Sequence, residues 1–402
     1  MSEKVVLAFS GGLDTSFCVK YLSEDRGLEV HSVLVDTGGF SDAELKAIEE
    51  RAYSLGVKSH VTISKTDDYY QQCLKYLVFG NVLKNNTYPL SVSAERIFQA
   101  IAAAEYARQI GASAIAHGST GAGNDQVRFD MAFRIIAPEA EIITPIRDLK
   151  LSREAEIEYL KSKGVEQEWH KAAYSINKGL WGTSVGGKET LTSDQFLPES
   201  AWPTPVSKTE PETITLTFSQ GEIKGIAGAS GDETFDNPVD AIRRLTELAS
   251  PFGIGRDIHV GDTIIGIKGR VGFEAPAPLI LIKAHHTLEK HVLTKWQLYW
   301  KDQLANWYGT MLHEGQFMDP VMRNIETFLS DTQGHVSGKV HVQLAPYRFQ
   351  VMGIESDYDL MSSAFGSYGE MNNAWTGDDV RGFSKVASNQ VMIYEKIREH
   401  NS

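Results

Sequence analysis

Short apolar runs and amphipathic stretches alternate over the first 168 residues. The runs lie at 4–9, 30–35, 57–63 and 113–116, and each is short enough to be a buried strand. The stretches between them place apolar residues at helical spacing. Repeated strand and helix predict a parallel sheet that is covered by helices on both faces, and therefore an α/β domain over 1–168.

Several of these helices carry recognisable start and stop signals. Ser41 stands three residues before Glu44, which predicts a capping box at the start of the helix that follows residue 41. Gly80, Gly111 and Gly164 each follow a helical pattern. We expect all three in the left-handed conformation that favours glycine just past a helix end.

The pattern changes after about residue 169. Polar and apolar residues alternate strictly at 213–218 and 339–344, which is typical of antiparallel strands with one solvent-exposed face. Helical patterns occur near 237–249, 291–309 and 319–330, and another runs from Val380 to Arg398. We therefore expect a second, α+β domain over 169–379 and a closing helical segment over 380–402.

Composition narrows the class of protein. The 402 residues carry a formal net charge of −13 without a basic run, which argues against a nucleic-acid partner. No apolar run is long enough for a membrane helix, and the first residues do not have the pattern of a signal peptide. Two cysteines, Cys18 and Cys73, cannot form a disulfide framework. These features predict a cytoplasmic enzyme that acts on small molecules.

The first candidate site is the loop between the end of the first strand and the start of the helix that follows it. Two glycines let the backbone approach an anion, hydroxyls add donors, and the helix N-terminus supplies free amides. No Gly-Lys-Ser/Thr follows, so this is not a Walker loop. The competing interpretation is a glycine turn that only caps the helix. The loop consists of Ala8, Phe9, Ser10, Gly11, Gly12, Leu13, Asp14, Thr15 and Ser16.

This string resembles the signature of the ATP pyrophosphatase family. The resemblance implies that the loop holds the pyrophosphate that leaves ATP, and that the intermediate is an adenylated carbonyl oxygen. Asp14 beside phosphates is then explained by a magnesium ion between them. Alternatively, Asp14 is an acid in the first helical turn that interacts favourably with the helix dipole.

A second glycine-rich loop follows the strand that ends at Ala116. It runs from His117 to Phe129 and contains three glycines. Ligands usually bind at this carboxyl end of a parallel sheet. Asp125 can meet an ammonium group, and Arg128 can bind a carboxylate through two hydrogen bonds. The loop therefore suits a zwitterionic amino acid. The alternative interpretation is a polar surface loop that binds no ligand.

The 117–129 string resembles the signature of argininosuccinate synthases, and the segments 88–93, 174–184, 252–256 and 284–289 are also similar to that family. The resemblance implies ATP-dependent ligation of citrulline and aspartate to argininosuccinate, AMP and pyrophosphate. It places ATP at residues 8–16, Val35 and Gly118. It places aspartate at Thr120, Asn124 and Asp125. The positions implied for citrulline are Tyr88, Ser93, Asn124, Arg128, Ser175, Ser184, Gly261 and Phe273.

The chemistry implied by this resemblance needs no protein nucleophile. Adenylation makes the ureido oxygen of citrulline a leaving group, and the neutral amine of aspartate then attacks the ureido carbon. Alignment and charge stabilisation supply most of the rate. The carboxylates with candidate catalytic roles are Asp14 and Asp125, and the latter is the best candidate to orient the amine.

The chain departs from the family pattern at two positions. A glutamate and, twelve residues later, a tyrosine contact citrulline in the family, but they are Gly261 and Phe273 here. In one explanation the neighbouring Asp262 or a water takes over, and free citrulline is the substrate. In the other, the α-nitrogen is acylated, and the absent side chain at Gly261 leaves room for the acyl group.

Three rival functions share parts of these motifs. A tRNA-modifying enzyme of the same superfamily would need an RNA surface and commonly thiolate pairs. A glutamine-dependent amidotransferase would need a glutaminase with an activated cysteine. A non-catalytic nucleotide-binding scaffold would have little reason to keep both loops. The family resemblance favours the ligase and implies a homotetramer joined through the C-terminal helix.

Overall fold

The computed structural model describes residues 3–166, 169, 173–229, 231–362, 368 and 374–401. The chain forms two compact units, residues 1–356 and 357–402. Among the described residues, no helix is both long and apolar enough to cross a membrane.

A five-stranded parallel sheet forms the N-terminal part of the larger unit, in the order β3-β2-β1-β4-β5. Its central strand β1 pairs with β2 on one side and with β4 on the other. The predicted parallel α/β fold is confirmed. The strands are β1 (Lys4–Ala8), β2 (Glu29–Asp36), β3 (Ser59–Ser64), β4 (Ala114–His117) and β5 (Glu141–Ile143).

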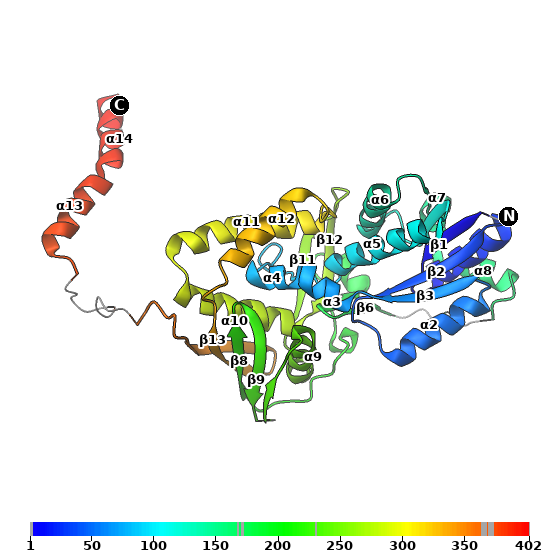
Figure 1. The fold of residues 1–402 in the computed structure, drawn as a ribbon, viewed down its shortest axis with the longest axis horizontal. Helices are drawn as coiled ribbons and strands as arrows, with labels where there is room; N and C mark the ends of the chain where they lie inside the picture. Colours follow the sequence, from blue (N-terminus) through cyan, green and yellow to red (C-terminus); the bar gives the residue numbers. More distant parts are fainter. Residues whose placement is uncertain are drawn as a thin grey trace. The chain divides into compact units, whose positions relative to one another are not determined.

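Helices cover both faces of this sheet, as Figure 1 shows for α5 and α2. Apolar residues of α1 (Leu13–Lys20), α2 (Asp42–Ser54) and α8 (Arg153–Ser162) pack on the face formed by Val5 and Leu7. The opposite face is covered by α5 (Ser93–Ile110) and α6 (Asp125–Ile136). Because both faces are covered, the edge at the carboxyl ends of the strands is where a ligand can enter.

Two antiparallel sheets form the rest of the larger unit, in the orders β10-β9-β8-β13-β14 and β11-β12-β7-β6. This confirms the antiparallel character of the second part. The first contains β8 (Glu212–Ser219), β9 (Glu222–Gly228), β10 (Gly231–Thr234), β13 (Gly338–Ala345) and β14 (Arg348–Glu355). The second contains β6 (Ser175–Gly179), β7 (Gly182–Gly186), β11 (Arg256–Asp262) and β12 (Lys268–Glu274).

The remaining helices of this unit are α3 (Thr66–Tyr69), α4 (Lys75–Phe79), α7 (Pro145–Leu149), α9 (Pro238–Ala249), α10 (Pro276–Val292), α11 (Lys295–His313) and α12 (Pro320–Asp331). The pattern near 291–309 spans the end of α10 and most of α11, because Leu293 and Thr294 leave the helical conformation and Thr294 caps α11. The smaller unit contains α13 (Gly377–Ala387) and α14 (Asn389–His400) rather than one closing helix.

Helix ends follow the sequence signals with one exception. Ser41 and Glu44 form the expected capping box. Gly111 and Gly164 are left-handed, with φ of 65° and 75°. Gly80 is not, because its φ is −83°. A Cβ there would lie 2.9 Å from the Cβ of Ala305, so close packing against α11 excludes a side chain.

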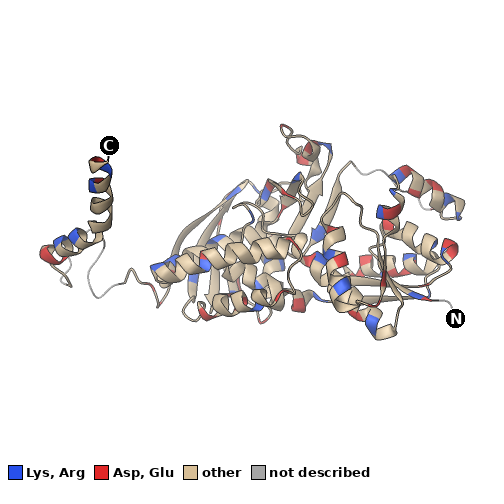
Figure 2. Ribbon diagram, turned by 90° about the horizontal axis from the view of Figure 1, so that it is seen from above, with Lys and Arg blue, Asp and Glu red and all other residues tan. Residues whose placement is uncertain are grey.

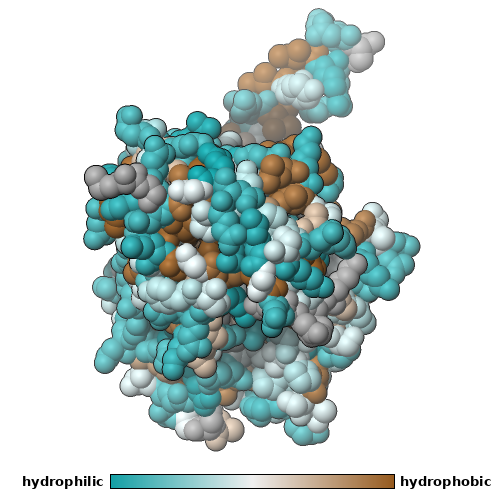
Figure 3. Space-filling view, turned by 90° about the vertical axis from the view of Figure 1, so that its right-hand side faces the viewer, coloured by the Kyte–Doolittle hydropathy of each residue, from teal (hydrophilic) through white to brown (hydrophobic). Residues whose placement is uncertain are grey.

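The surface is polar and mixed in charge. In Figure 2, acidic and basic positions are interspersed along the described helices, without a continuous basic stripe on that face. The face in Figure 3 is mostly hydrophilic, with hydrophobic positions in separate groups. The face in Figure 2 therefore does not show the basic stripe that is typical of nucleic-acid binding.

Candidate active site

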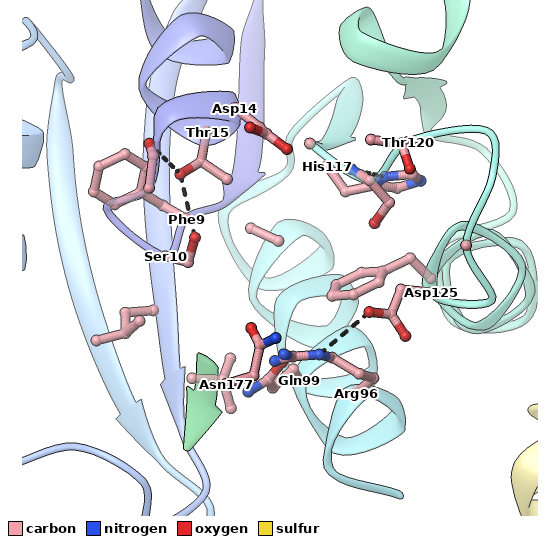
Figure 4. A pocket seen from close by; sticks show the side chains of 18 of the residues that line it. Phe9, Ser10, Asp14, Thr15, Arg96, Gln99, His117, Thr120, Asp125 and Asn177 are labelled. Atoms are coloured by element: carbon pink, nitrogen blue, oxygen red, sulfur yellow. Dashed lines mark hydrogen bonds and ion pairs between the residues drawn. The ribbon is translucent and has the colours of Figure 1, made fainter. Parts of the chain in front are cut away.

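A cavity of about 600 Å³ opens at the carboxyl ends of β1, β2 and β4. Its walls come from both glycine-rich loops, from α5 and from β6, as Figure 4 shows. The lining residues are Ala8, Phe9, Ser10, Gly12, Leu13, Asp14, Thr15, Val33, Leu34, Val35, Phe40, Arg96, Gln99, His117, Gly118, Ser119, Thr120, Gly123, Asp125, Phe129, Ser175 and Asn177.

The first loop turns sharply from β1 into α1. The hydroxyls of Ser16 and Thr15 donate to the carbonyl oxygen of Gly12, at 2.8 and 3.3 Å. Ser10 Oγ lies 3.4 Å from Thr15 Oγ1. Gly11 has a φ of +74°, which favours glycine, and its carbonyl accepts a hydrogen bond from Arg51. Gly11 and Ser16 therefore shape the loop from behind, and the other expected loop residues line the cavity.

The second loop packs directly against the first. Ala8 and His117 are register partners at the ends of β1 and β4, so the two loops leave the sheet side by side. A Cβ on Gly118 would lie 3.2 Å from Thr15 Cγ2. Thr120 and Asp125 line the cavity. Asn124 does not, because its Oδ1 accepts a hydrogen bond from the amide of Ile264 at 2.8 Å.

Two arginines hold the carboxylate of Asp125. Arg128 Nη1 lies 2.8 Å from Oδ1, and Arg96 Nε lies 3.4 Å from Oδ2. Although burial opposes the charge on Arg96, neighbouring Glu95 and Asp125 raise its pKa. Burial raises the pKa of Glu95 to about 7, although Arg96 and Thr37 oppose this. At this end of the cavity, ion pairs therefore hold the charged side chains of Asp125, Arg96 and Arg128 in place.

A second pair of acids lies at the first loop. Asp14 lines the cavity and contacts Glu156 of α8. Burial raises the pKa of Asp14, and burial together with Asp14 raises that of Glu156 to about 7. One carboxylate oxygen of Glu156 is buried and has no hydrogen-bond partner among the described residues. Two adjacent carboxylates favour a proton or a cation between them.

The residues expected at citrulline fall into two groups. Ser175 lines the cavity. Tyr88, Ser93, Ser184 and Phe273 lie beyond it and are buried. Ser93 Oγ donates to the Tyr88 hydroxyl at 3.3 Å, and the rings of Tyr88 and Phe273 are 5.4 Å apart.

These outer residues connect to the cavity through polar side chains. Asn177, which lines the cavity, donates to Ser184 Oγ at 3.4 Å. Ser184 is the register partner of Phe273. Arg128 is buried, donates to the carbonyl of His313, and is joined to the cavity through its ion pair with Asp125.

The space beside Gly261 is filled by a residue two positions earlier on the same strand face. A Cβ on Gly261 would lie 2.5 Å from Nε2 of His259. The His259 ring stacks on Tyr88 with centroids 5.1 Å apart. Asp262 points to the other face of β11 and pairs with Lys268 at 2.6 Å. Asp262 therefore cannot replace the glutamate of the family pattern from this position.

Comparison with known proteins connects this site to a family. The family model described as "Arginosuccinate synthase N-terminal HUP domain" matches residues 4–166, and "Arginosuccinate synthase C-terminal domain" matches residues 174–394. The chain belongs to the argininosuccinate synthase family.

Curated relatives match along the whole chain. The argininosuccinate synthase of Methanocaldococcus jannaschii is 38% identical over 398 residues, covering 98% of each chain. That of Xanthomonas campestris is 36% identical, covering 98% of this chain and 99% of its own. That of Sulfolobus acidocaldarius is 34% identical with the same coverage. The chain is thus an ATP-dependent ligase with argininosuccinate synthase activity.

Several cavity residues of this chain carried no local sequence signal. Arg96 and Gln99 lie one turn apart on α5, a helix that is mostly buried. Asn177 comes from β6, which no alternation in the sequence marked. His117 could have been found, because it begins the second glycine-rich loop. The others reach the cavity only through tertiary packing.

Proposed function

We propose that citrulline is adenylated and then joined to aspartate in the cavity between the two loops. The observation that carries this proposal is the register of Ala8 with His117, which puts the phosphate loop and the amino-acid loop on adjacent strands. ATP belongs along residues 8–16, Val35 and Gly118, and aspartate belongs at Thr120 and Asp125.

The first step is attack of the ureido oxygen on the α-phosphorus of ATP. The phosphate loop offers the free amides at the start of α1 and the hydroxyls of Ser10 and Thr15. These donors can stabilise the charge of the departing pyrophosphate. Tyr88, Ser93 and Ser184, with Asn177 between them and the cavity, are suited to hold the polar ends of citrulline. The protein contributes alignment of the oxygen and the phosphorus.

The second step is attack of the aspartate amine on the ureido carbon, which expels AMP. Asp125 can accept a hydrogen bond from that amine, and its two arginine partners fix the carboxylate in place. Thr120 and Arg96 are candidates for the carboxylates of aspartate. Since the leaving group is already activated, orientation of the amine is the main task of this loop.

Asp14 also fits a magnesium ion bound to the phosphates. The carboxylate lies on the cavity wall next to Glu156, an arrangement that a cation would relieve. The described residues contain no group of three or more ligands for a metal. This suits magnesium, which commonly takes one or two carboxylates and completes its shell with phosphate oxygens and water. Bound there, it would neutralise the charge of the pyrophosphate.

The α-nitrogen of the ureido substrate is a separate question, and a specific observation favours a second candidate. The group beside Gly261 on this face of β11 is the imidazole of His259, and Asp257, which shares the face by alternation, is exposed. Glu95 and Asp125 are already paired with arginines. An uncharged, acylated nitrogen would suit this surface, but the imidazole of His259 occupies the room expected for the acyl group. We therefore retain free citrulline as the first candidate and an N-acylated citrulline as the second.

We further propose a cytoplasmic homotetramer with domains at 1–168 and 169–379 and a C-terminal oligomerisation segment at 380–402. The support is that α13 and α14 expose apolar side chains such as Phe383, Val386 and Ile393 and contain no buried residue. Amphipathic helices of this kind usually pack against a partner.

A product assay tests the activity. Incubation with ATP, citrulline and aspartate should yield AMP, pyrophosphate and argininosuccinate in equal amounts. Formation of ADP and phosphate, or of AMP without argininosuccinate, would contradict the proposal.

A further inference from the structure

Four polar side chains behind the second glycine loop form a connected network. They are His117 at the end of β4, Gln126 and Asp130 of α6, and Arg147 of α7. The roles proposed above use none of them. The loop that they support contains Gly118, Gly121 and Gly123. Glycines lose more backbone freedom on ordering than other residues, so a loop of this composition needs external support to hold one shape.

His117 connects this network to the start of the loop. Its side chain is buried, and its Nδ1 accepts a hydrogen bond from the amide of Ser119 at 3.1 Å. Because that nitrogen is an acceptor, the ring proton resides on Nε2. Nε2 lies 3.0 Å from Asp130 Oδ1 and donates to it. The position of Asp130 therefore selects the tautomer that can hold Ser119.

Arg147 connects the same carboxylate to the middle of the loop. Its Nη1 donates to Asp130 Oδ2 at 2.9 Å and to Gln126 Oε1 at 3.3 Å. Gln126 Nε2 in turn donates to the carbonyls of Gly121 and Gly123, at 2.7 and 3.1 Å. Burial disfavours the charge on Asp130, but the hydrogen bonds from His117 and Arg147 outweigh it and lower its pKa.

We propose that Asp130 is a positioning residue for aspartate binding, acting through His117 at one end of the loop and through Arg147 and Gln126 at the other. Asp130 touches no substrate in this proposal. It accepts two hydrogen bonds that fix the backbone from Gly118 to Gly123, and so the places of Thr120 and Asp125. The inference rests on the proposed role of this loop in holding aspartate.

Asp130→Asn is the informative substitution. Asparagine offers one side-chain oxygen where two donors converge, so the bond to His117 or the bond to Arg147 must be lost. We expect kcat/KM for aspartate to fall about 10- to 100-fold, as for other residues that orient a ligand-binding group. The fall should be mainly a rise in KM for aspartate. Pyrophosphate–ATP exchange with citrulline, which does not involve aspartate, should change little.

Asp148→Asn is the matched control, because Asp148 also pairs with Arg147, at 3.5 Å, whereas the hydrogen bonds of His117 within the described part of the chain go to Asp130 and Ser119. It should keep the KM for aspartate of the unsubstituted enzyme. Equal effects of the two substitutions, or an unchanged KM in folded Asp130→Asn, would overturn the proposal. Inactivity of the unsubstituted enzyme would instead contradict the proposed function.

A spectroscopic measurement tests the network in the unsubstituted enzyme as well as in the variants. Nitrogen NMR of the histidine rings in the unsubstituted enzyme should show His117 protonated on Nε2, with the signal assigned by its loss in His117→Gln. In Asp130→Asn the Nε2 tautomer should lose population. A ring protonated on Nδ1 in the unsubstituted enzyme would overturn the proposal.

Discussion

The imidazole of His259 occupies the space in which a side chain at Gly261 would begin, with Nε2 2.5 Å from the position of a Cβ. The same ring stacks on Tyr88, and burial lowers its pKa. A neutral imidazole therefore stands where the family pattern has a carboxylate. This exchange of a negative group for a neutral one bears on which ureido compound is bound.

Comparison of free citrulline with N-acetyl- and N-succinylcitrulline addresses this point. Free citrulline should be preferred, because His259 fills the space that an acyl group would need. A preference of tenfold or more in kcat/KM, about 1.4 kcal/mol, would rule out the acylated substrate. His259→Ala should narrow the preference by opening that space. A preference of the unsubstituted enzyme for either acylated compound would instead establish the second candidate.

Gly12→Val should abolish pyrophosphate release without unfolding the protein. Gly12 lines the cavity and has an ordinary φ of −77°, and the nearest atom to a new Cβ is Ser10 Oγ at 3.5 Å. The added methyls therefore project toward the phosphates rather than into the core. Release of pyrophosphate and the melting temperature should be measured together. Gly353→Val, at a site open around the new Cβ, is the control, and full activity of Gly12→Val would refute the phosphate assignment.

Asp125→Ala should impair ligation more than adenylation. Asp125 lies on the amino-acid loop and pairs with Arg96 and Arg128, and among the described residues no hydrogen bond or ion pair joins it to the phosphate loop. Pyrophosphate–ATP exchange with citrulline reports the first half-reaction alone. Argininosuccinate formation reports both. Equal losses in the two assays would show that Asp125 serves both steps.

Part of this site followed from the sequence because two kinds of local signal were present. Apolar runs of strand length marked β1 and β4, and the glycine loops directly after them had to meet at one sheet edge. Arg96 and Asn177 had no such signal, because their place depends on how α5 and β6 pack. The orientation of Asp262 also required the structure, since a shift of one residue in β11 would have turned it inward.

Glu95 should make the stability of the protein depend on pH. Burial raises its pKa to about 7 from a usual 4.5, so the folded protein binds a proton that the unfolded chain has released between these values. This contribution to the free energy of unfolding is complete below about pH 4.5 and is lost as the pH rises through about 7. Between pH 5 and pH 8, the free energy of unfolding should therefore decrease by about 1–3 kcal/mol less in Glu95→Gln than in the unsubstituted protein.

Urea unfolding at pH 5 and pH 8 measures the effect. Glu105→Gln is the matched control, since Glu105 lies on the same helix and is exposed. It should leave the pH dependence unchanged. The same pH dependence in Glu95→Gln as in the unsubstituted protein would show that Glu95 is ionised in the fold.

The pairing of Ala8 with His117 also constrains how the enzyme can open. Both binding loops continue from hydrogen-bonded neighbours in one sheet, so the strand ends from which the loops start are held together by the sheet. The wall opposite them is different, because Ser175 and Asn177 belong to β6, an edge strand of a separate sheet. The β6–β7 hairpin is therefore the wall of the cavity that can shift without disturbing the parallel sheet.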